Sequence, residues 1–457
     1  MRSGSFRTLT LFLIAILILC GMASVSADSV EDVFDYRITD DGSAVITGYK
    51  GSAKELVFPE TIEGHTVTAL GASFSANTVS VKTISSIAIP AVMTAVEPGA
   101  LQFAEYLTEM IVADDNPVMS FRDGVLYDRE KESIVLYLQS NAASDFEIPE
   151  GIREIGDKAF YRSKLVSVRF PGSVERIGSE SFNQCIRLSE VSLSEGLKSI
   201  DKEAFTNCDR LKRIEIPASV TDIAESVFTD SHLKEILVAP GSEVFSVSDG
   251  ALINERDGVL IAFPHSSGAE TCTIPEGVKR IGSFAFYRSH NLKQVNFPDG
   301  LLEIGHGAFV SCNHLTELNL PDSIVRLEEA SFGCNSDVEK LHIPAGLTEI
   351  VNNFNDMAVS ELEIPENVTT IKESFCSLRN LTEAVIPAGV KTIGRGAFAF
   401  CRNLAGITIP GSVTEFDCTF IGCAGTLLIR TDPGSCVERY CTGHHMRYEY
   451  ISEKEGN

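Results

Sequence analysis

The stretch that decides the fold is Leu-Lys-Gln-Val-Asn-Phe-Pro at residues 292–298, followed by Ile-Gly-His-Gly-Ala-Phe-Val-Ser-Cys at residues 304–312. The same pattern begins at Leu211, where Leu-x-x-Ile-x-Ile-Pro ends at Pro217. A unit that returns at a fixed spacing is the sequence signature of a repeat protein, in which each unit packs on its neighbours. The chain is therefore expected to be a repeat solenoid.

The proline that closes the first half of the unit recurs along most of the chain, with Ser194 in its place once, and most steps are 21 to 23 residues. Weaker copies are marked by Pro59 and Pro90. A period in the low twenties predicts coils that each add one strand to a parallel sheet. The marker prolines are Pro149, Pro171, Pro217, Pro240, Pro275, Pro298, Pro321, Pro344, Pro365, Pro387 and Pro410.

Each part of the unit has an expected structural role. The Ile-x-Ile alternation is typical of a strand with one buried face, and the following proline, which cannot donate to a ladder, ends that strand. The Val-x-x-Ile-Gly segment turns the chain back, with room for a second short strand. We expect positive φ at its glycines, because glycine adopts that conformation without steric cost. These are Gly156, Gly178, Gly282, Gly305 and Gly394.

The Ala-Phe pair is expected to close each coil on its far side, so that stacked coils align the rings in one aromatic column. Each ring buries on the order of 150–250 Å², which makes this column a leading stabilising element. Its members are Phe160, Phe182, Phe205, Phe228, Phe286, Phe309, Phe332, Phe354, Phe375, Phe398 and Phe420.

Two coils are longer than the rest, with 36 residues from Ala113 to Pro149 and 35 from Pro240 to Pro275. Both contain an Asp-Gly pair, at residues 123–124 and 249–250, followed by two β-rich runs around a charged turn. Such runs predict a hairpin that projects from the solenoid. The match between the two coils indicates a larger duplicated unit.

The repeat unit Ile-Pro-x-x-Val-x-x-Ile-Gly-x-x-Ala-Phe-x-x-Cys-x-x-Leu resembles the BspA-type leucine-rich repeat of surface proteins, and the resemblance covers nearly all of the chain after residue 27. It implies a curved, right-handed leucine-rich-repeat superhelix, and it implies adhesion to host proteins or other cells. Residues 46–51 resemble the N-terminal coil of that family, and residues 432–448 resemble its closing segment. Coils in residues 327–376 lack the usual Gly or Ala and are expected to be irregular.

The N-terminus has the features of a secretory signal peptide. Arg2 and Arg7 precede the apolar run at 9–19, and Val-Ser-Ala at 25–27 is a cleavage site. The run is shorter than the roughly 20 residues of a membrane-spanning helix. We therefore expect secretion, with an association at the cell surface left open and no transmembrane anchor in the mature chain. The expected organisation is a signal peptide at 1–27, a cap at 28–56, repeats at 57–410, and a last coil with the C-terminal cap at 411–457.

From Val57 to Thr408 the repeats are expected to form one continuous superhelix without an interior domain boundary. Removal of residues 1–27 takes Cys20 away and leaves 11 of the 12 cysteines, an odd number that cannot form a complete set of disulfides. We therefore favour a column of buried thiols over disulfides. It is formed by Cys185, Cys208, Cys312, Cys334, Cys401 and Cys423.

A net charge of −25 opposes binding to nucleic acid and to anionic membranes. Residues 305–307 and 394–396 have a Gly-x-Gly pattern, but both lie inside the repeat and are interpreted as turns. Cys436, Cys441, His444 and His445 have the chemistry of zinc ligands, although their spacing matches no standard zinc site. No catalytic residues, metal or cofactor are predicted, and the protein is not expected to be an enzyme.

The outward-facing positions of the first strand tile one continuous surface, and their residues vary from coil to coil while the inward positions do not. Either this surface binds a ligand or it is an ordinary solvated face. We predict an extracellular binding or adhesion scaffold for a host, matrix or cell-surface protein or glycoconjugate. A structural surface-layer role is the alternative, and an unrecognised enzyme is a weaker one. The candidate ligand-binding residues are Arg169, Glu215, Asn296, Asn319, His342 and Glu363.

Overall fold

The computed structural model describes residues 30–417 and 420–451, so the predicted signal peptide lies outside the described residues. The chain divides into two compact units, with the boundary in the sequence between Gly124 and Val125. The expectation of one continuous superhelix from Val57 to Thr408 is therefore wrong. Each unit is described by itself.

Unit 1 contains a small mixed sheet and a short parallel ladder. Strand β1 pairs antiparallel with β2, β2 pairs parallel with β5, and β3, β6 and β8 form the parallel ladder. Phe34, Phe58 and Phe74 pack in its core, with ring centroids 5.7–6.0 Å apart. The elements are α2 (Val30–Val33), β1 (Phe34–Ile38), β2 (Ala44–Tyr49), β3 (Glu55–Val57), β4 (Thr61–Ile62), β5 (His65–Leu70), α3 (Phe74–Asn77), η1 (Val81–Thr83), β6 (Ser86–Ile89), β7 (Ala95–Val96), β8 (Glu109–Val112) and β9 (Met119–Arg122).

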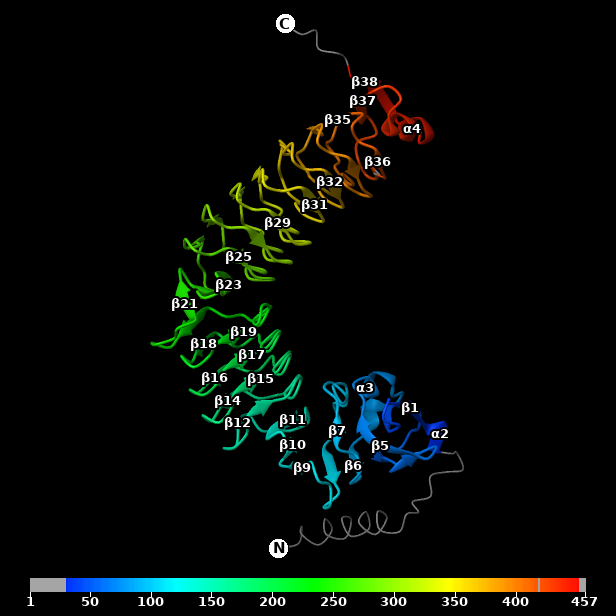
Figure 1. The fold of residues 1–457 in the computed structure, drawn as a ribbon, viewed down its shortest axis with the longest axis vertical. Coiled ribbons are helices and arrows are strands. Elements are labelled where there is room, and N and C mark those ends of the chain that lie inside the picture. The colour runs from blue at the N-terminus through cyan, green and yellow to red at the C-terminus, as the bar shows by residue number, and fades with distance from the viewer. Residues whose placement is uncertain (1–29, 418–419, 452–457) are drawn as a thin grey trace. The chain divides into compact units, whose positions relative to one another are not determined.

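Unit 2 is a β-solenoid whose coils stack one on another (Figure 1). The Ile-x-Ile segments form the first ladder, which is parallel and in register, for example Asn319 opposite His342. Its strands are β12 (Asp145–Glu147), β14 (Ser167–Arg169), β16 (Glu190–Ser192), β18 (Arg213–Ile216), β20 (Glu235–Val238), β24 (Thr271–Thr273), β26 (Gln294–Asn296), β28 (Glu317–Asn319), β30 (Lys340–His342), β33 (Glu383–Val385), β35 (Gly406–Ile409), β37 (Leu428–Thr431) and β38 (Arg447–Tyr450).

The returning segment carries the second short strand that the sequence left room for, and these strands form a second parallel ladder. At the C-terminal end, helix α4 (Cys436–Gly443) packs beside β36 and β37, and Ser435 caps it by accepting from Glu438 N. The strands of the second ladder are β13 (Glu154–Ile155), β15 (Arg176–Ile177), β17 (Ser199–Ile200), β19 (Asp222–Ile223), β25 (Arg280–Ile281), β27 (Glu303–Ile304), β29 (Arg326–Leu327), β31 (Glu349–Val351), β32 (Thr370–Lys372), β34 (Thr392–Ile393) and β36 (Glu415–Phe416).

The two long coils do form antiparallel strands, but these strands do not project from the solenoid. Strand β11 (Ser133–Tyr137) pairs with β10 (Val125–Asp128) and then continues into the second ladder through β13. In the same way β21 (Phe245–Ser248), β22 (Ala251–Asn254) and β23 (Val259–Ala262) form a meander that joins the ladder at β25. All four residues of β22 are buried, so the expected projecting hairpin is incorrect.

The meander separates two hydrophobic cores. Leu252 and Ile261 pack in a core made by residues 125–262, whereas Ile253 and Leu260 pack in a core made by residues 251–441. Alternate side chains of a strand point to opposite faces, so a strand buried on both faces serves two cores. Unit 2 therefore consists of an N-terminal block, residues 125–238, and a C-terminal block, residues 263–451, on either side of the meander.

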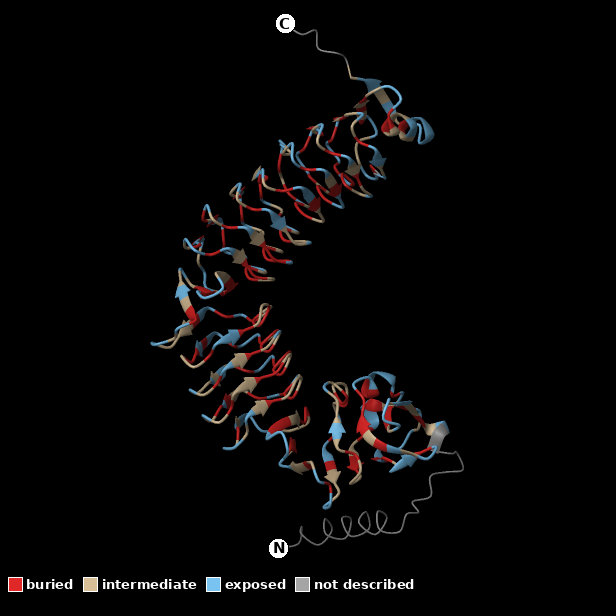
Figure 2. Cartoon of the chain, in the orientation of Figure 1, coloured by how far each residue is buried: buried red, intermediate tan, exposed pale blue. Residues whose placement is uncertain are grey.

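The predicted aromatic column is present as two stacks, one in each block. Its predicted last member, Phe420, is not part of the second stack and lies 6.3 Å from Phe416 with the rings tilted by 39°. Phe309 stacks on Phe286 with centroids 4.7 Å apart and on Phe332 at 5.1 Å, and both pairs are within 9° of parallel. The first ring of each stack was not predicted, because it comes from the end of a long coil and not from an Ala-Phe pair. Tyr137 stacks on Phe160 at 5.0 Å, and Phe263 stacks on Phe286 at the same distance. The buried residues line the inside of every coil (Figure 2).

The repeated glycines are required for a different reason from the one expected. Gly156 and Gly178 are not among the residues with positive φ. A Cβ at Gly156 would lie 2.8 Å from Ile134 O, and one at Gly178 would lie 2.7 Å from Ile155 O. These positions need glycine because the backbones of successive coils approach closely there. Gly282, Gly305 and Gly394 also lack positive φ. A Cβ at the first two would lie 3.0 and 2.7 Å from backbone atoms of the preceding coil, whereas one at Gly394 would lie 2.8 Å from the Lys372 side chain.

The coils without the repeat's glycine are irregular, as the sequence indicates. Strands β31 and β32 extend over Val351 and Lys372, where other coils have glycine. Phe354 and Phe375 have positive φ, at 61° and 64°, and their centroids are 6.1 Å apart. Residues 361–364 form no strand, which interrupts the first ladder between β30 and β33.

Replacing Tyr137 with phenylalanine is expected to raise the free energy of unfolding by about 1 kcal/mol, because a buried hydroxyl without a partner costs desolvation energy. Tyr137 is 1% exposed, and its hydroxyl makes no hydrogen bond in the structure. Burial raises the pKa of this phenol to about 12. Urea denaturation of the two chains measures the effect. A loss of stability would show that the hydroxyl is hydrogen-bonded, for example to water.

Candidate ligand-binding surface

The six candidate residues are all exposed, as the alternation of the first strand predicts. In β28, Leu318 is buried between the exposed Glu317 and Asn319, and β18, β24 and β26 show the same alternation. Their side chains are therefore available to a ligand without disturbing the core. The six are Arg169 in β14, Glu215 in β18, Asn296 in β26, Asn319 in β28, His342 in β30, and Glu363.

Glu363 differs from the other five because it lies in no strand. It belongs to residues 361–364, where the first ladder is interrupted. Period-two alternation assigned it to the sheet, and that assignment is wrong for this coil. Its side chain is exposed, but its position on the surface is set by a loop.

In the C-terminal block the face carries a stripe of uncharged polar side chains. Asn296 Nδ2 donates to Thr273 Oγ1 at 3.0 Å, and Gln294 Nε2 donates to Asn296 Oδ1 at 3.0 Å. Asn319 and His342 are register partners on neighbouring strands. This stripe stands out in a chain with 63 acidic and 38 basic residues. We call Thr273, Gln294, Asn296, Asn319 and His342 the amide stripe; Thr273 and Gln294 were not predicted.

Asp322 fixes the end of the amide stripe. His342 Nε2 lies 3.1 Å from Asp322 Oδ1, which also accepts from Ala345 N at 2.9 Å. The backbone hydrogen bond from Ala345 and the one from His342 lower the pKa of Asp322. Asp322 therefore orients an exposed imidazole on the sheet face.

The N-terminal block and the C-terminal end of the face are more charged. Arg169 lies near Asp145, where hydrogen bonds from Ser144 and Ser167 are the main causes of a lowered pKa and Arg169 adds to them. At the other end, Arg430 donates to Glu383 at 3.0 Å and to Glu449 at 2.9 Å. Sequence reasoning missed this cluster, because it joins residues 19 and 47 positions apart across the cap.

The cysteine column is structural. The cysteine three residues after a column Phe donates to a carbonyl of the preceding coil: Cys185 Sγ to Phe160 O at 3.1 Å and Cys312 Sγ to Phe286 O at 3.1 Å. All ten described cysteines are free thiols. Burial raises the pKa of Cys312 to about 12, so it is not nucleophilic at neutral pH.

One member of the expected cysteine column is misplaced. Cys334 is exposed and has a φ of 58°, and its neighbour Asn335 occupies the position of the column. Asn335 Nδ2 donates to Phe309 O at 3.0 Å. Other small donors can therefore take the place of cysteine at this position, and serine does so where Ser231 donates to Phe205 O.

One groove of unit 2 is lined by side chains that already pair with one another. This groove has a volume of about 330 Å³ and is lined by glycines of neighbouring turns and by charged residues. Arg153 bonds Glu132 at 2.7 Å and Glu175 at 3.0 Å. No group of three or more metal-ligating side chains is found in residues 30–417 and 420–451, which include Cys436, Cys441, His444 and His445.

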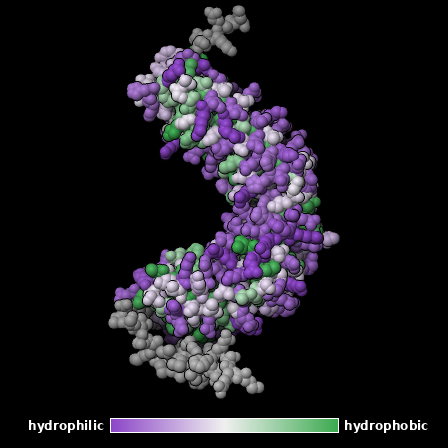
Figure 3. Space-filling view, turned by 180° about the vertical axis from the view of Figure 1, so that it is seen from behind, coloured by the Kyte–Doolittle hydropathy of each residue, from purple (hydrophilic) through white to green (hydrophobic). Residues whose placement is uncertain are grey.

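The surface is also mainly hydrophilic. In the view of Figure 3 the hydrophobic residues form small, separate patches. Among the described residues, no helix is both long and apolar enough to cross a membrane.

Two parallel ladders, a coil of 21 to 23 residues and a stacked phenylalanine column define a leucine-rich-repeat β-solenoid. The family model described as a BspA type leucine rich repeat region matches residues 132–254, 261–375 and 351–426, in six copies. The chain belongs to this family. A comparison with curated proteins finds no match.

Solved structures show the same fold. The pneumococcal vaccine antigen PcpA is 18% identical, with a TM-score of 0.52 over 94% of this chain and 99% of that one. A leucine-rich repeat protein from Eubacterium ventriosum is 20% identical, with a TM-score of 0.52 over 86% and 94%. A leucine rich cell surface protein from Faecalibacterium prausnitzii is 21% identical, with a TM-score of 0.43 over 92% and 98%.

Proposed function

We propose that the protein is an extracellular binding or adhesion scaffold that recognises a protein or glycoconjugate through the outward face of its first ladder. The observation that carries the proposal is the contrast between the inward and outward positions of the first-ladder strands. Inward positions hold the same kind of residue in coil after coil, whereas outward positions change from Arg169 to Glu215, Asn319 and His342. A rigid scaffold that presents variable side chains at regular spacing suits recognition.

Two further observations support secretion and surface exposure. The N-terminal segment has the arrangement of a signal peptide. The chain also belongs to the BspA-type leucine-rich repeat family, whose repeat occurs in surface proteins. The groove of about 330 Å³ is lined by charged side chains that pair with one another, so its polar groups do not converge on a ligand as those of a small-molecule site do.

The test of this proposal is to probe residues 28–457 against an array of matrix proteins, mucins and glycans. A binding scaffold gives saturable binding to a defined ligand. Self-assembly without saturable binding to any member of the array would instead support a structural surface-layer component. Turnover of an array member would identify an enzyme.

Once a ligand is found, alanine at Glu215, Asn296, Asn319 and His342 together is expected to raise its Kd at least tenfold while the melting temperature holds. Interface residues that carry binding energy cost more than 1 kcal/mol each when truncated, whereas exposed substitutions change stability by only about 0.5 kcal/mol. Isothermal titration calorimetry and thermal denaturation measure the two effects.

The matched control replaces four exposed threonines, each directly before a strand of the second ladder, with alanine, which keeps the number and exposure of the changes similar. They are Thr221, Thr348, Thr369 and Thr414. This control is expected to leave Kd unchanged. If it weakens binding and the first-ladder variant does not, the ligand binds the second ladder and the proposed surface is wrong.

A further inference from the structure

The two blocks of unit 2 meet at a seam that lacks the regular contacts between coils. The first ladder has no pair between β20 and β24, and the second ladder ends at β19 and resumes at β23 of the meander. The ladders are also unpaired between β16 and β18, β26 and β28, and β29 and β31, but the rings stack across those positions. At the seam the stacks of rings break as well, since the last pair of one is Phe205–Phe228 and the first pair of the next is Phe263–Phe286. The seam is formed by residues 221–233 on one side and 256–290 on the other.

Beside the apolar side chains of β23 that pack in the N-terminal core, charged groups and single hydrogen bonds connect the two sides of the seam. Glu225 binds the Arg280 guanidinium and accepts from Ser283 N at 2.7 Å. Asp230 binds Arg288 at 2.8 Å. Ser266 N donates to Leu233 O at 3.0 Å. The strength of such contacts depends on whether the groups are charged. The stacking of apolar rings inside each block does not depend on charge.

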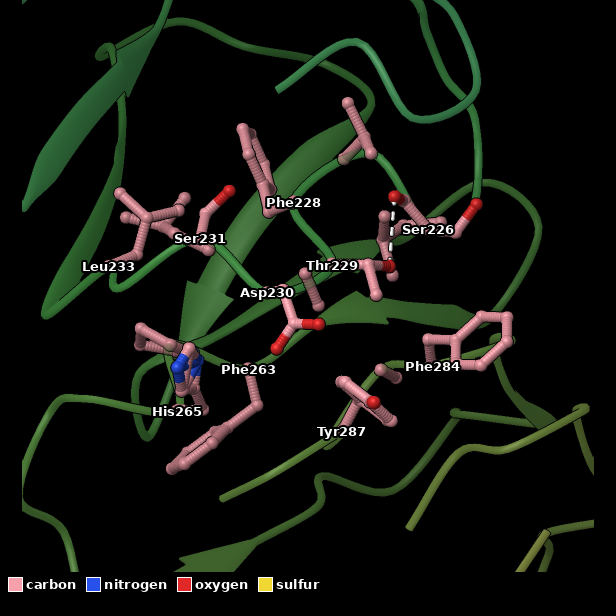
Figure 4. Close-up of a pocket in the computed structure, with 16 residues that line it drawn as sticks. Ser226, Phe228, Thr229, Asp230, Ser231, Leu233, Phe263, His265, Phe284 and Tyr287 are labelled. Carbon is pink, nitrogen blue, oxygen red and sulfur yellow. Dashed lines mark hydrogen bonds between the residues drawn. The ribbon is translucent and has the colours of Figure 1, made fainter. Parts of the chain in front are cut away.

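His265 lies in the middle of the seam, at a cavity of about 20 Å³, which is room for one water molecule. Figure 4 shows Asp230 between His265 and Tyr287. The ring of His232 lies 5.3 Å from that of His265, measured between centroids. The charged or titratable groups that act on His265 are therefore His232 and Asp230 from the N-terminal block, and Arg288 and His290 from the C-terminal block.

The surroundings of His265 favour its neutral form. Burial is the main cause of a pKa lowered from the ordinary 6.5 to about 4, and His232, His290 and Arg288 lower it further against the opposing charge of Asp230. A proton on His265 would place a cation beside the Arg288 guanidinium in a partly buried site. His265 is therefore harder to protonate in the closed seam than it would be if it were exposed to water.

The first long coil provides a natural comparison, because it has the same arrangement without the titratable group. Tyr137 and Phe263 are equivalent as the first rings of their stacks, so Gln139 is the counterpart of His265. Gln139 Nε2 donates to Tyr161 O at 3.3 Å. Glutamine is therefore compatible with the backbone at this position.

We propose that the seam is an acid-sensitive hinge, which holds the two blocks together while His265 is neutral and opens when His265 takes up a proton. Opening changes the relative orientation of the two blocks and so divides the sheet face into two separate surfaces. The hinge acts on the scaffold whatever its ligand is.

The direction of the pH dependence follows from linkage. In the open seam His265 is solvated and its pKa returns towards 6.5, so the open state binds more protons between pH 6.5 and 4. The closed state is therefore lost as pH falls through this window. Opening is expected to be about 30-fold more frequent at pH 5.0 than at pH 7.5.

Hydrogen exchange of the full chain, read by mass spectrometry and corrected for the intrinsic effect of pH, tests the hinge. The amides of Ser266 and Ser283 donate across the seam and report its opening. Their exchange is expected to rise about 30-fold between pH 7.5 and 5.0. The amide of Gly178, which donates to Ile155 O inside the N-terminal block, serves as the internal control and is expected to stay constant.

His265→Gln is expected to abolish the pH dependence at Ser266 and Ser283, with His265→Asn as a second variant if the first does not fold. Glu225→Gln weakens one connection of the seam and is expected to speed exchange at both pH values while the ratio between them is kept. The proposal is overturned if the wild-type amides do not respond to pH, or if the His265 variants respond as the wild type does.

Discussion

Replacing Phe309 with alanine is expected to lower the free energy of unfolding by about 3–5 kcal/mol, because truncation of a buried phenylalanine removes apolar contacts and leaves a cavity. Phe309 is fully buried and stacks between Phe286 and Phe332. The neighbouring rings are held by their own coils, so the cavity cannot collapse. The loss is expected to appear as a lower midpoint in urea denaturation.

Phe400 provides the matched control, because it is a phenylalanine of a later coil whose side chain is exposed, at 48%. Phe400→Ala is expected to change the free energy of unfolding by about 0.5 kcal/mol at most. Equal effects of the two substitutions would contradict the aromatic column as the main stabilising element.

The second large effect is expected at the meander. Leu252→Ala and Ile253→Ala should each cost about 2–4 kcal/mol, although the two residues are adjacent, because both are buried. They pack in different cores, Leu252 in the N-terminal block and Ile253 in the C-terminal block. Their effects are therefore expected to add in the double variant.

Hydrogen exchange of each single variant distinguishes the two cores. Leu252→Ala is expected to raise exchange mainly in residues 125–238, and Ile253→Ala mainly in residues 263–451. Deletion of residues 252–262 would remove strands that both cores need, so we expect that variant not to fold. A stable, folded deletion variant would contradict the meander as an internal part of the solenoid.

The aromatic column illustrates what sequence reasoning can predict. The Ala-Phe pairs repeat at constant spacing, so stacking of Phe286, Phe309 and Phe332 follows from the period alone. Tyr137 and Phe263 were missed, because each ends an irregular strand and has no repeat context. The break between the two stacks, and with it the seam, was missed for the same reason.

The backbone of the turns could not be predicted from residue types. Lys158 and Arg162, on either side of Phe160, have φ of 59° and 57° without being glycine. Their amides donate to Ser179 O and Asn183 O of the next coil, at 2.9 and 3.0 Å. These bonds between coils stabilise a conformation that the local sequence does not favour. Glycine was needed at Gly156 and Gly178 for close packing instead.

For the candidate surface, the exposure of Arg169, Asn319 and His342 followed from period-two alternation. The alternation could not predict that the strand around Glu363 is missing. It also could not predict contacts set by the stacking of distant coils. Arg430 with Glu383 and Glu225 with Arg280 are separated by 47 and 55 residues.

The most direct test of the proposed binding surface is hydroxyl-radical footprinting of the full chain with and without its ligand. His342 and Val385 lie on the first-ladder face, whereas Val325 and Ile421 are exposed elsewhere, and the three aliphatic residues have similar exposed fractions of 57–62%. The proposal predicts that the ligand slows oxidation of His342 or Val385 and leaves Val325 and Ile421 unchanged. Protection of Val325 or Ile421 alone would contradict it.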